Sequence, residues 1–485
     1  MAERKMKVLM VVLCFLPESV GGSEFYTYNL SQELRLRGYD VTVLAGLQDT
    51  TIERYTVIET TFEGLRVIKI VNSFYYARAF RDFFLDDRVN AIFKDLLGKE
   101  RFDLVHFQHL PFLSGSLPEI AHGMKVPSVF TVHDYWYMCF RSQLLRPGHG
   151  PCPGPSGGVY CASCKEVDAP SPIAVPNPIA TPKVPFLGKI MDSPFVRNLN
   201  LRERLSPAVK QKIKHVLYRQ PVFEKAGEEN PSDPILKEHT FRFEFFKRQF
   251  LYPRYVLSPS RHLKKRYEEV GYREFRHVPL GFYPSEKVES LVFHGILKIA
   301  YLGNVVPFKG AGVVVRELAR LKKMHMHRVE AHIYGKPVNQ SYYDEVRKAA
   351  NQLPLGSVTF HGPYRSDVDM NRILSGMHLV VFPSLWEENY PLVVREALLH
   401  GIPVIGSRLG GVSEAIEDGV NGFLFDPYRE GELAERIGFI LDNPGALDKI
   451  TQGARKTKIV SMDEHMEMMT GLYAEGAGRQ DVTES

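Results

Sequence analysis

Apolar and polar positions in the first fifty residues form alternating segments of two kinds. Residues 8–16 are a near-continuous apolar run, which is the pattern of a central strand in a parallel sheet. A glycine-containing loop follows, and residues 24–37 then carry apolar positions at helical spacing up to Gly38. Residues 41–44 form a second apolar run. The order strand, glycine loop, helix and strand predicts the opening of a doubly wound α/β domain.

The same order begins again in the second half of the chain. A predicted strand is followed by a loop that holds Lys309 and Gly310, and then by a segment with helical spacing. The expected strands of this half include residues 299–303, 331–334 and 358–360. We therefore expect two doubly wound, Rossmann-like domains and a C-terminal helix and tail that can return to the N-terminal domain. Their expected bounds are 1–284, 285–462 and 463–485.

Length and composition limit the class of protein. A chain of 485 residues exceeds one ordinary domain, and 44% hydrophobic with 24% charged residues is the composition of a globular protein. The formal net charge of +5 does not favour a nucleic-acid partner, although it permits contact with an anionic membrane surface or a phosphorylated ligand. No apolar run reaches the ~18 residues that span a bilayer. Because Pro17 and Glu18 follow the first apolar run, we interpret that run as a buried strand instead of a signal peptide, and we expect a cytoplasmic protein.

The segment 382–411 reads FPSLWEENYPLVVREALLHGIPVIGSRLGG and predicts a strand end, a loop, a helix and another strand. Pro391 stands at an early helical position, and Gly401 lies just past the helix. Glu388 precedes this helix, and Glu396 lies inside it, eight residues later. Two such glutamates are often only a solvated loop residue and a helix former. Beside the positive end of a helix they can also hold the hydroxyl groups of a ligand.

The string ENYPLVVREALLHGIPVIGSRLGG resembles the E-x7-E region of retaining glycosyltransferases of the family-4 type. That family has the GT-B architecture, in which two Rossmann-like domains face each other across a cleft. Pro391 departs from the motif, which often has glycine after the aromatic residue, but the two glutamates keep their spacing. The resemblance implies that Glu388 holds hydroxyls of the donor sugar and Glu396 those of the ribose. It also places the following residues in the donor site: Asn389, Tyr390, Pro391 and Leu392.

The resemblance extends to two segments of the N-terminal half. Gly21 and Gly22 follow the first predicted strand, where a glycine pair alone indicates only a turn. In the resembled family this loop faces the donor diphosphate and the acceptor. His133, in the string TVHDYW, lies at the strand end where doubly wound sheets bind ligands. The matching histidine of the family sits over the donor sugar, near the reacting carbon. We interpret the neighbouring His106 and His109 as structural residues.

Lys309 belongs to a G-x5-K-G string that matches the donor-diphosphate motif of the family. An arginine commonly follows the first glycine of that motif, and this chain has Asn304 there. Compensation of the phosphate charge would then depend on Lys309, on backbone amides or on another cation such as Arg408. Asn304 is expected in the donor site, and Gly335, at the end of a predicted strand, is expected to line the pocket for the base and ribose.

The cysteines are concentrated in one glycine- and proline-rich segment. Cys139, Cys152, Cys161 and Cys164 lie within 26 consecutive positions, and the last two form a C-x2-C pair. Four cysteines in such a loop can hold a structural zinc ion in tetrahedral geometry. They can also remain free or transiently paired thiols, and the irregular spacing leaves both interpretations open.

Residues 139–251 form an insertion that the usual family pattern does not account for. Its segment 168–186 is rich in proline and is expected to be an exposed loop. The stretch 239–255 mixes arginine and lysine with many aromatic residues. We favour a helix that packs these aromatics on the N-terminal domain. Contact with a membrane surface is the second interpretation, since members of the family often act on lipid-linked acceptors.

The resemblance implies a retaining transfer from a nucleotide-diphosphate sugar to a hydroxyl of a saccharide, glycan or lipid-linked acceptor, as in polysaccharide biosynthesis. His133, Glu388 and Lys309 would carry the chemistry, the donor would be a substrate, and no catalytic cofactor or metal is expected. The protein would be cytoplasmic, including a peripheral position at the inner face of the membrane. The alternatives are a GT-B-like sugar phosphorylase or epimerase and a non-catalytic nucleotide-sugar-binding protein. A dinucleotide dehydrogenase is excluded, because no G-x-G-x-x-G follows either first strand.

Overall fold

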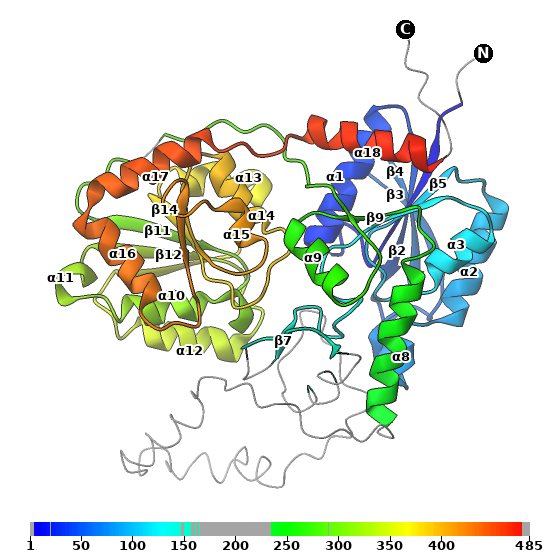
Figure 1. The fold of residues 1–485 in the computed structure, drawn as a ribbon, viewed down its shortest axis with the longest axis horizontal. Coiled ribbons are helices and arrows are strands. Elements are labelled where there is room, and N and C mark those ends of the chain that lie inside the picture. The colour runs from blue at the N-terminus through cyan, green and yellow to red at the C-terminus, as the bar shows by residue number, and fades with distance from the viewer. Residues whose placement is uncertain are drawn as a thin grey trace.

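The computed structural model of the chain describes residues 4–19, 21–146, 150–156, 161, 164, 234–289 and 291–477. They form two α/β domains that lie side by side, each built on its own sheet (Figure 1). This confirms the expected fold class of two doubly wound, Rossmann-like domains. Among the described residues, no helix combines the length and the apolar character needed to cross a membrane.

The N-terminal domain contains an eight-stranded sheet with the order β10-β9-β6-β5-β1-β2-β4-β3. All neighbouring strands are parallel except β3 and β4, which form an antiparallel pair. The strands are β1 (Lys7–Val12), β2 (Asp40–Leu47), β3 (Val57–Phe62), β4 (Leu65–Val71), β5 (Leu104–Phe107), β6 (Ser128–Thr131), β9 (Tyr255–Ser258) and β10 (Arg276–His277). The helices are α1 (Gly22–Leu36), η1 (Phe74–Tyr76), η2 (Phe80–Phe83), α2 (Asp87–Lys99), α3 (Leu117–Gly123), α8 (Pro234–Gln249) and α9 (Arg261–Glu269). Strands β7 (Leu145–Arg146) and β8 (Gly150–Pro151) pair in antiparallel orientation.

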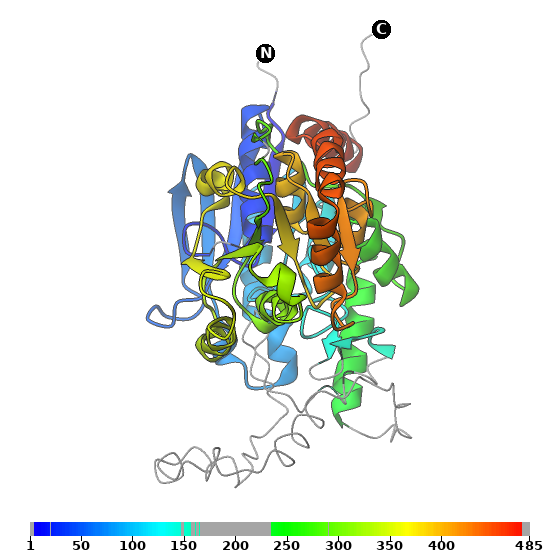
Figure 2. The same ribbon diagram turned by 90° about the vertical axis from the view of Figure 1, so that its left-hand side faces the viewer.

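The C-terminal domain contains a six-stranded parallel sheet with the order β13-β12-β11-β14-β15-β16. The strands are β11 (Leu297–Leu302), β12 (Val329–Tyr334), β13 (Val358–Gly362), β14 (Leu379–Phe382), β15 (Val404–Ser407) and β16 (Gly422–Phe425). The helices are η4 (Pro307–Lys309), α10 (Ala311–Leu318), α11 (Lys323–Met326), α12 (Gln340–Ala350), α13 (Ser366–Leu374), α14 (Leu392–Leu399), α15 (Val412–Ala415), α16 (Glu432–Asp442) and α17 (Pro444–Lys456). Figure 2 looks at this domain, whose helices cover both faces of the sheet.

Alternation of side chains along β1 explains why its sequence is apolar throughout. Leu9 and Val11 point to one face of the sheet and join the core beneath α2, α3 and α8. Val8 and Met10 point to the other face and join the core beneath α1. Both sides of this central strand are therefore buried, as its near-continuous hydrophobicity predicts.

The final helix, α18 (Met462–Gly476), packs on the N-terminal domain although it follows the C-terminal one in sequence (Figure 1). Met466, Met469 and Tyr473 are buried there in the same core as α1 and β1. A capping box at Ser461 and Glu464 fixes the start of the helix. The chain thus crosses between the domains twice.

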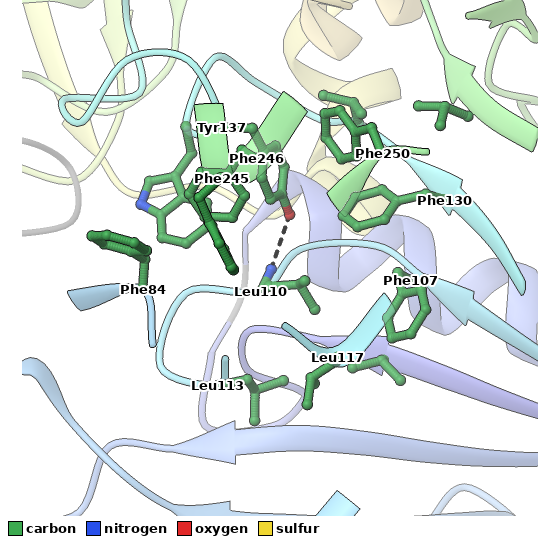
Figure 3. Packing of buried hydrophobic residues seen from close by; sticks show 14 of the residues in the cluster. Phe84, Phe107, Leu110, Leu113, Leu117, Phe130, Tyr137, Phe245, Phe246 and Phe250 are labelled. Atoms are coloured by element: carbon green, nitrogen blue, oxygen red, sulfur yellow. Dashed lines mark hydrogen bonds between the residues drawn. The ribbon is translucent and has the colours of Figure 1, made fainter. Parts of the chain in front are cut away.

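Helix α8 places the aromatic residues of the stretch 239–255 in the N-terminal core. Phe246 and Phe250 are fully buried and pack with Phe130 and Tyr137 (Figure 3). The Tyr137 hydroxyl accepts a hydrogen bond from the Leu110 amide at 3.1 Å. The expected packing of this helix on the N-terminal domain is confirmed. The proline-rich segment 168–186 lies outside the described residues.

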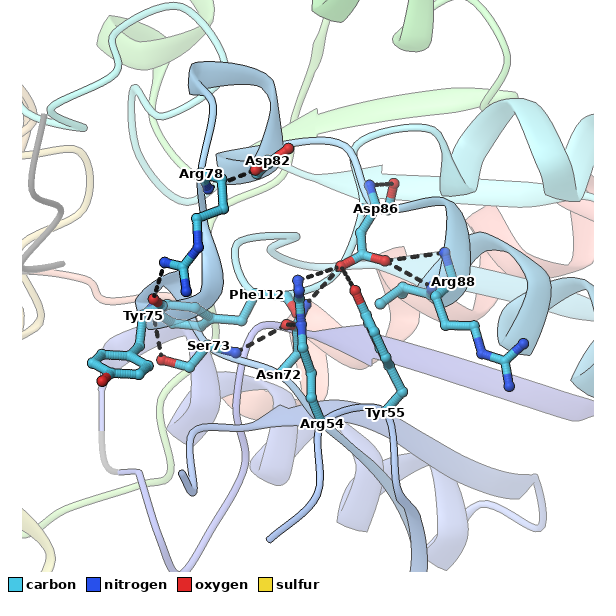
Figure 4. A network of polar contacts seen from close by, with 12 residues as sticks. Arg54, Tyr55, Asn72, Ser73, Tyr75, Arg78, Asp82, Asp86, Arg88 and Phe112 are labelled. Carbon is cyan, nitrogen blue, oxygen red and sulfur yellow. Dashed lines mark hydrogen bonds and ion pairs between the residues drawn. The ribbon is translucent and has the colours of Figure 1, made fainter. Parts of the chain in front are cut away.

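A polar network anchors the loop between β4 and α2 (Figure 4). Asp86 caps α2 by accepting from the amides of Arg88 and Val89 through Oδ1. Its Oδ2 accepts from Arg54 at 3.0 Å and from the Tyr55 hydroxyl at 3.1 Å. A buried carboxylate needs such partners, and here they fix the loop at the edge of the sheet where β1, β5 and β6 also end.

Candidate active site

Glu388 lies in the loop between β14 and α14, and its side chain is only 8% exposed. Its Oε1 accepts from Lys309 Nζ at 2.6 Å, from Trp386 Nε1 at 2.7 Å and from Ser384 Oγ at 3.1 Å. The cation and the two neutral donors stabilise a charge that burial alone would disfavour. The structure therefore brings together two of the three residues expected to carry the chemistry.

Close backbone approaches hold this loop in place. A Cβ atom on Gly411 would lie 1.8 Å from the Asn389 carbonyl oxygen, and the Gly411 amide donates to the Glu388 carbonyl at 2.7 Å. Gly310, beside Lys309, has a φ of 78°, and a Cβ there would lie 1.9 Å from a carbonyl oxygen of the Glu388 loop. Only glycine fits either position. The lysine loop and the glutamate loop are thus fixed against each other.

Glu396 lies on α14 and has no hydrogen-bond partner for its carboxylate among the described residues. Burial raises its pKa from 4.5 to about 7. The Tyr364 ring is a neighbour, since the charge of Glu396 contributes to raising the pKa of its hydroxyl. A partner-free carboxyl group that is partly exposed can accept hydrogen bonds from ligand hydroxyls.

Gly335 follows β12 at the same edge of the sheet. A Cβ there would lie 1.8 Å from the Gly303 carbonyl oxygen, and its amide donates to the Gly362 carbonyl at 2.7 Å. Gly335 therefore allows the ends of β11, β12 and β13 to approach closely. Asn304, the next residue after Gly303, has an exposed side chain. Arg408 pairs with Asp418 at 3.2 Å.

His133 follows β6 at the boundary between the domains. Its Nε2 lies 2.8 Å from Gln108 Oε1, and the Tyr26 ring packs against its imidazole with a centroid separation of 5.4 Å. Burial, with a smaller contribution from the nearby His109, lowers the pKa of His133 to about 3. The imidazole is therefore neutral at physiological pH.

Asn389 connects the two domains directly beside Glu388. Its Nδ2 donates to the His133 carbonyl at 2.8 Å, and its Oδ1 accepts from Ser260 Oγ at 2.7 Å. Ser260 is also the N-cap of α9, accepting from the Leu263 amide. Both ends of the amide are thus occupied by the N-terminal domain, whereas the sequence prediction assigned this residue to donor binding.

The neighbours of Asn389 contribute further contacts between the domains. Glu387 accepts from His262 Nε2 and from Arg266 Nε, both at 3.0 Å. The Tyr390 hydroxyl donates to the Leu280 carbonyl at 3.2 Å. Pro391 is the N-cap of α14, and Leu392 packs partly against the N-terminal core.

A carboxylate of the chain itself lies at the glycine loop that was expected to face phosphate. Gly21 is the N-cap of α1, and helix α1 begins at Gly22. Glu24 is buried there and accepts from Ser19 Oγ and Ser23 Oγ, each at 2.7 Å. A Cβ on Gly21 would lie 2.6 Å from Glu24 Oε2. An anion at this helix end would meet a carboxylate, which the sequence prediction did not consider.

The four cysteines of the insertion, predicted either to hold zinc or to remain thiols, lie near one another in the structure. The part of the chain that the structure describes includes all four cysteines of the insertion, yet it holds no group of three or more His, Cys, Asp or Glu residues arranged for a metal ion. Burial raises the pKa of Cys152 to about 12 and that of Cys164 to about 11, and the nearby Cys139 contributes to both shifts. Cys139, Cys152, Cys161 and Cys164 form no disulfide in the structure, and a zinc ion bound by them stays a prediction.

The sequence did not predict the residues that hold the site residues and their loops in place. Gln108 carried one signal, because it is a polar residue close to an apolar strand. Ser260 carried a capping signal, since it precedes a helix. Glu24 and Glu387 stand beside residues that were singled out, but their partners are set by the folded chain.

Two family models match the chain, one in each domain. The model described as Glycosyltransferase Family 4 matches residues 20–153, and that described as Glycosyl transferases group 1 matches residues 285–457. A D-inositol 3-phosphate glycosyltransferase of Mycobacterium marinum is 29% identical over 179 residues, which cover 36% of this chain and 35% of that protein. The protein of the same name from Mycolicibacterium smegmatis is 29% identical over 154 residues, covering 31% and 34%. The matches thus span about a third of the length of these relatives.

Two solved structures show the same fold. Sucrose-phosphate synthase from Thermosynechococcus elongatus has a TM-score of 0.62 at 15% identity, with 98% of this chain and 100% of that chain covered. Anabaena HepE in complex with UDP and glucose has a TM-score of 0.58 at 16% identity, with 97% and 100% covered. The two family models together match more than half of the residues, and the chain therefore belongs to the glycosyltransferases of the family-4 type, with the GT-B fold.

Proposed function

We propose that the protein is a retaining glycosyltransferase that moves a sugar from a nucleotide-diphosphate donor to a hydroxyl of a saccharide, glycan or lipid-linked acceptor. One observation carries the proposal most directly: Lys309 and Glu388 form a 2.6 Å ion pair beside the domain boundary where His133 lies. This arrangement offers a cation for phosphate, a carboxylate for hydroxyls and a neutral imidazole. In this proposal residues 1–284 recognise the acceptor and residues 285–462 hold the donor.

Departure of the nucleotide diphosphate builds negative charge on its oxygens, and Lys309 is the group that would stabilise it. In the structure, Lys309 contacts Glu388. A diphosphate that attracts the lysine would release one hydrogen bond at Glu388 Oε1 while Trp386 and Ser384 still hold the carboxylate. Glu388 would then accept from hydroxyls of the donor sugar. The pair therefore joins two groups that are each suited to binding a part of the donor.

Glu396 would accept from the ribose hydroxyls, because it is a carboxyl group without an internal partner. Gly335 and Asn304 would line the pocket next to it. Donor contacts of Asn389 and Tyr390 would require a rearrangement, since both side chains contact the N-terminal domain here. Pro391 and Leu392 would contribute the start of α14, whose amides favour an anionic group. The Gly21-Gly22 loop would face the diphosphate only if Glu24 moved away.

His133 would contact the donor sugar as a neutral hydrogen-bonding group, since its pKa is about 3. Glu388 is held by three donors and is suited to binding hydroxyls more than to attacking carbon. A reaction on one face of the sugar, in which the leaving phosphate takes the proton of the acceptor hydroxyl, gives retention without a protein nucleophile. No catalytic cofactor enters this scheme.

The comparisons indicate where to begin with substrates. The Mycobacterium relatives are named for D-inositol 3-phosphate, and Anabaena HepE binds UDP and glucose. UDP-glucose is therefore the first donor to test, and polyol or saccharide hydroxyls are the first acceptors. We place the reaction in the cytoplasm, including the inner face of the membrane for a lipid-linked acceptor in polysaccharide biosynthesis.

The test is release of nucleotide diphosphate from a panel of UDP-, GDP-, ADP- and TDP-sugars, with and without acceptors. Glu388→Ala and Lys309→Ala are expected to lower release by about a hundredfold, because each removes a charge aimed at the donor. Lys298→Ala is the matched control, since Lys298 is an exposed lysine of the same domain that pairs with Glu330 at 3.8 Å.

The outcomes separate the alternatives. The anomeric configuration of the product, read by NMR, decides between retention and inversion. A requirement for inorganic phosphate would identify a phosphorylase, and an isomerised donor would identify an epimerase. Donor binding without turnover across the acceptor panel would favour a binding protein. If no donor binds and none is turned over, the proposal is wrong.

A further inference from the structure

We propose that Gln108 is a positioning residue that presents His133 to the bound donor sugar as a hydrogen-bond acceptor, through Nδ1. This inference rests on the proposed function, because it gives His133 a substrate to contact. It assigns a role to a residue that neither the motifs nor the family resemblance marks. The orientation of the buried side-chain amide of Gln108 determines this role.

Gln108 lies just beyond β5 and is completely buried. Its Oε1 is 2.8 Å from His133 Nε2, and its Nε2 is 3.1 Å from both ring nitrogens of His106. No point in the plane of an imidazole ring can be that far from both nitrogens without colliding with the carbon between them. The amide nitrogen of Gln108 therefore lies over the face of the His106 ring.

The ring of His106 determines which end of the amide faces it. Both of its nitrogens already have hydroxyl partners, Tyr473 at 2.6 Å and Thr131 at 2.8 Å. The face of an aromatic ring attracts an N–H donor and repels a carbonyl oxygen. The NH₂ group of Gln108 therefore faces His106, and its carbonyl oxygen faces His133.

The direction of the amide fixes the tautomer of His133. A carbonyl oxygen only accepts, so His133 Nε2 must carry the hydrogen. A neutral imidazole has one N–H, which leaves a lone pair at Nδ1. Nδ1 has no partner among the described residues, and the His133 side chain is partly exposed. A sugar hydroxyl can therefore donate to Nδ1.

The support for Gln108 extends to the C-terminal helix. Tyr473, which holds His106, belongs to α18, and the same helix carries His465, which contacts the Tyr26 hydroxyl at 3.0 Å. Tyr26 in turn packs against the His133 ring. The helix that returns to the N-terminal domain thus supports the imidazole on two sides. This explains a buried polar network in an otherwise apolar region.

A double-mutant cycle tests the proposal with the full-length protein. Gln108→Met keeps the length of the side chain but removes the hydrogen bond, and kcat with the active donor is expected to fall about tenfold. Combined with His133→Ala, it is expected to cause no further loss, because Gln108 acts only through the imidazole. Gln249→Met is the matched control: Gln249 is a buried glutamine of the same domain that contacts Glu119 at 2.9 Å. It is expected to leave kcat unchanged.

A second variant provides a readout that a purely structural role would not change. Gln108→Glu replaces the side-chain amide by a carboxylate. Its negative charge stabilises the imidazolium form of His133 and therefore raises the pKa of His133. Below that pKa, Nδ1 carries a proton and cannot accept. At saturating donor, kcat of this variant is expected to fall toward acidic pH relative to the parent. The titratable groups near His133 are His106, His109 and Asp134, with Tyr26 from α1. The contacting residue of the C-terminal domain is Asn389, which does not titrate and stands between Glu388 and Tyr390 in sequence. All these groups are unchanged between parent and variant.

The results distinguish this inference from the proposed function. An active parent whose Gln108→Met effect adds fully to that of His133→Ala would overturn the positioning role. An active parent whose Gln108→Glu variant shows the parental pH profile would overturn it as well. A parent that neither binds nor turns over any donor would instead refute the proposed function.

Discussion

Replacing Glu396 by glutamine should stabilise the protein at alkaline pH and weaken donor binding at the same time. Burial raises the pKa of Glu396 from 4.5 to about 7. Each pKa unit is equivalent to 1.4 kcal/mol, so the ionised carboxylate costs the folded state about 3 kcal/mol as an upper bound. Because the folded-state pKa is higher than the unfolded one, stability falls as pH rises from about 4.5 through about 7. Above pH 7 the whole penalty is present.

Glutamine is neutral and has almost the shape of a protonated glutamic acid. Glu396→Gln is therefore expected to have the thermal stability of the parent at pH 5 and a Tm about 5 °C higher at pH 8.5. Its donor affinity at pH 8.5 is expected to fall about tenfold or more, because a carboxylate accepts more strongly from ribose hydroxyls than an amide does. Calorimetry at the two pH values and titration with the active donor measure both quantities.

The exposed Glu345 on α12 provides the control, since Glu345→Gln should change neither quantity. This expectation is wrong if Glu396→Gln destabilises the protein equally at both pH values, because a structural hydrogen bond would then outweigh desolvation. It is also refuted if the variant gains stability but binds the donor as the parent does. That result would separate the buried carboxylate from the ribose site.

Two further changes test the framework of the site. Asn389→Ala removes both amide contacts to the N-terminal domain. It should raise the radius of gyration in small-angle X-ray scattering and lower kcat/KM by about tenfold. Unchanged scattering and kinetics would contradict the linking role. Gly335→Ala places a Cβ 1.8 Å from the Gly303 carbonyl oxygen and should lower the free energy of unfolding by about 3 kcal/mol, whereas Gly445→Ala, with nothing within 4 Å of its Cβ, should cost nothing in urea unfolding. Equal stability of the two glycine variants would show that the close approach at Gly335 is not needed.

Local patterns predicted the fold because the strands that organise it are buried on both faces. The apolar run at residues 8–16 predicted β1, and runs that end at glycine predicted β11 and β12. Strand β3 was not predicted, because it is an exposed edge strand whose residues are mainly accessible. Strand β10 was not predicted either, since two residues give no periodicity. A continuous apolar run therefore predicts a buried strand, whereas an exposed edge strand has no such pattern.

The site was predictable only where its residues are neighbours in sequence. Glu388 and Glu396 stand eight residues apart, and the resemblance of the string around them to the family motif identifies them without a structure. The contact of Lys309 with Glu388 joins positions 79 residues apart, and that of Gln108 with His133 joins positions 25 apart. No periodic pattern encodes such distances, because they depend on strand order and domain packing. The resemblance to a family placed Lys309 and Glu388 in one site. No pattern in the sequence predicted that Gln108 contacts His133.

Three consecutive residues link the arrangement of the domains to the chemistry. Glu387 and Asn389 both contact the N-terminal domain, whereas Glu388, between them, turns to Lys309 in its own domain. The backbone that carries Glu388 is therefore held on either side by contacts that exist only while the domains touch. Asn389 also holds the backbone of His133, so the same contact places the imidazole beside the carboxylate loop. The contact between the domains therefore also orients the proposed catalytic groups, which come from both domains.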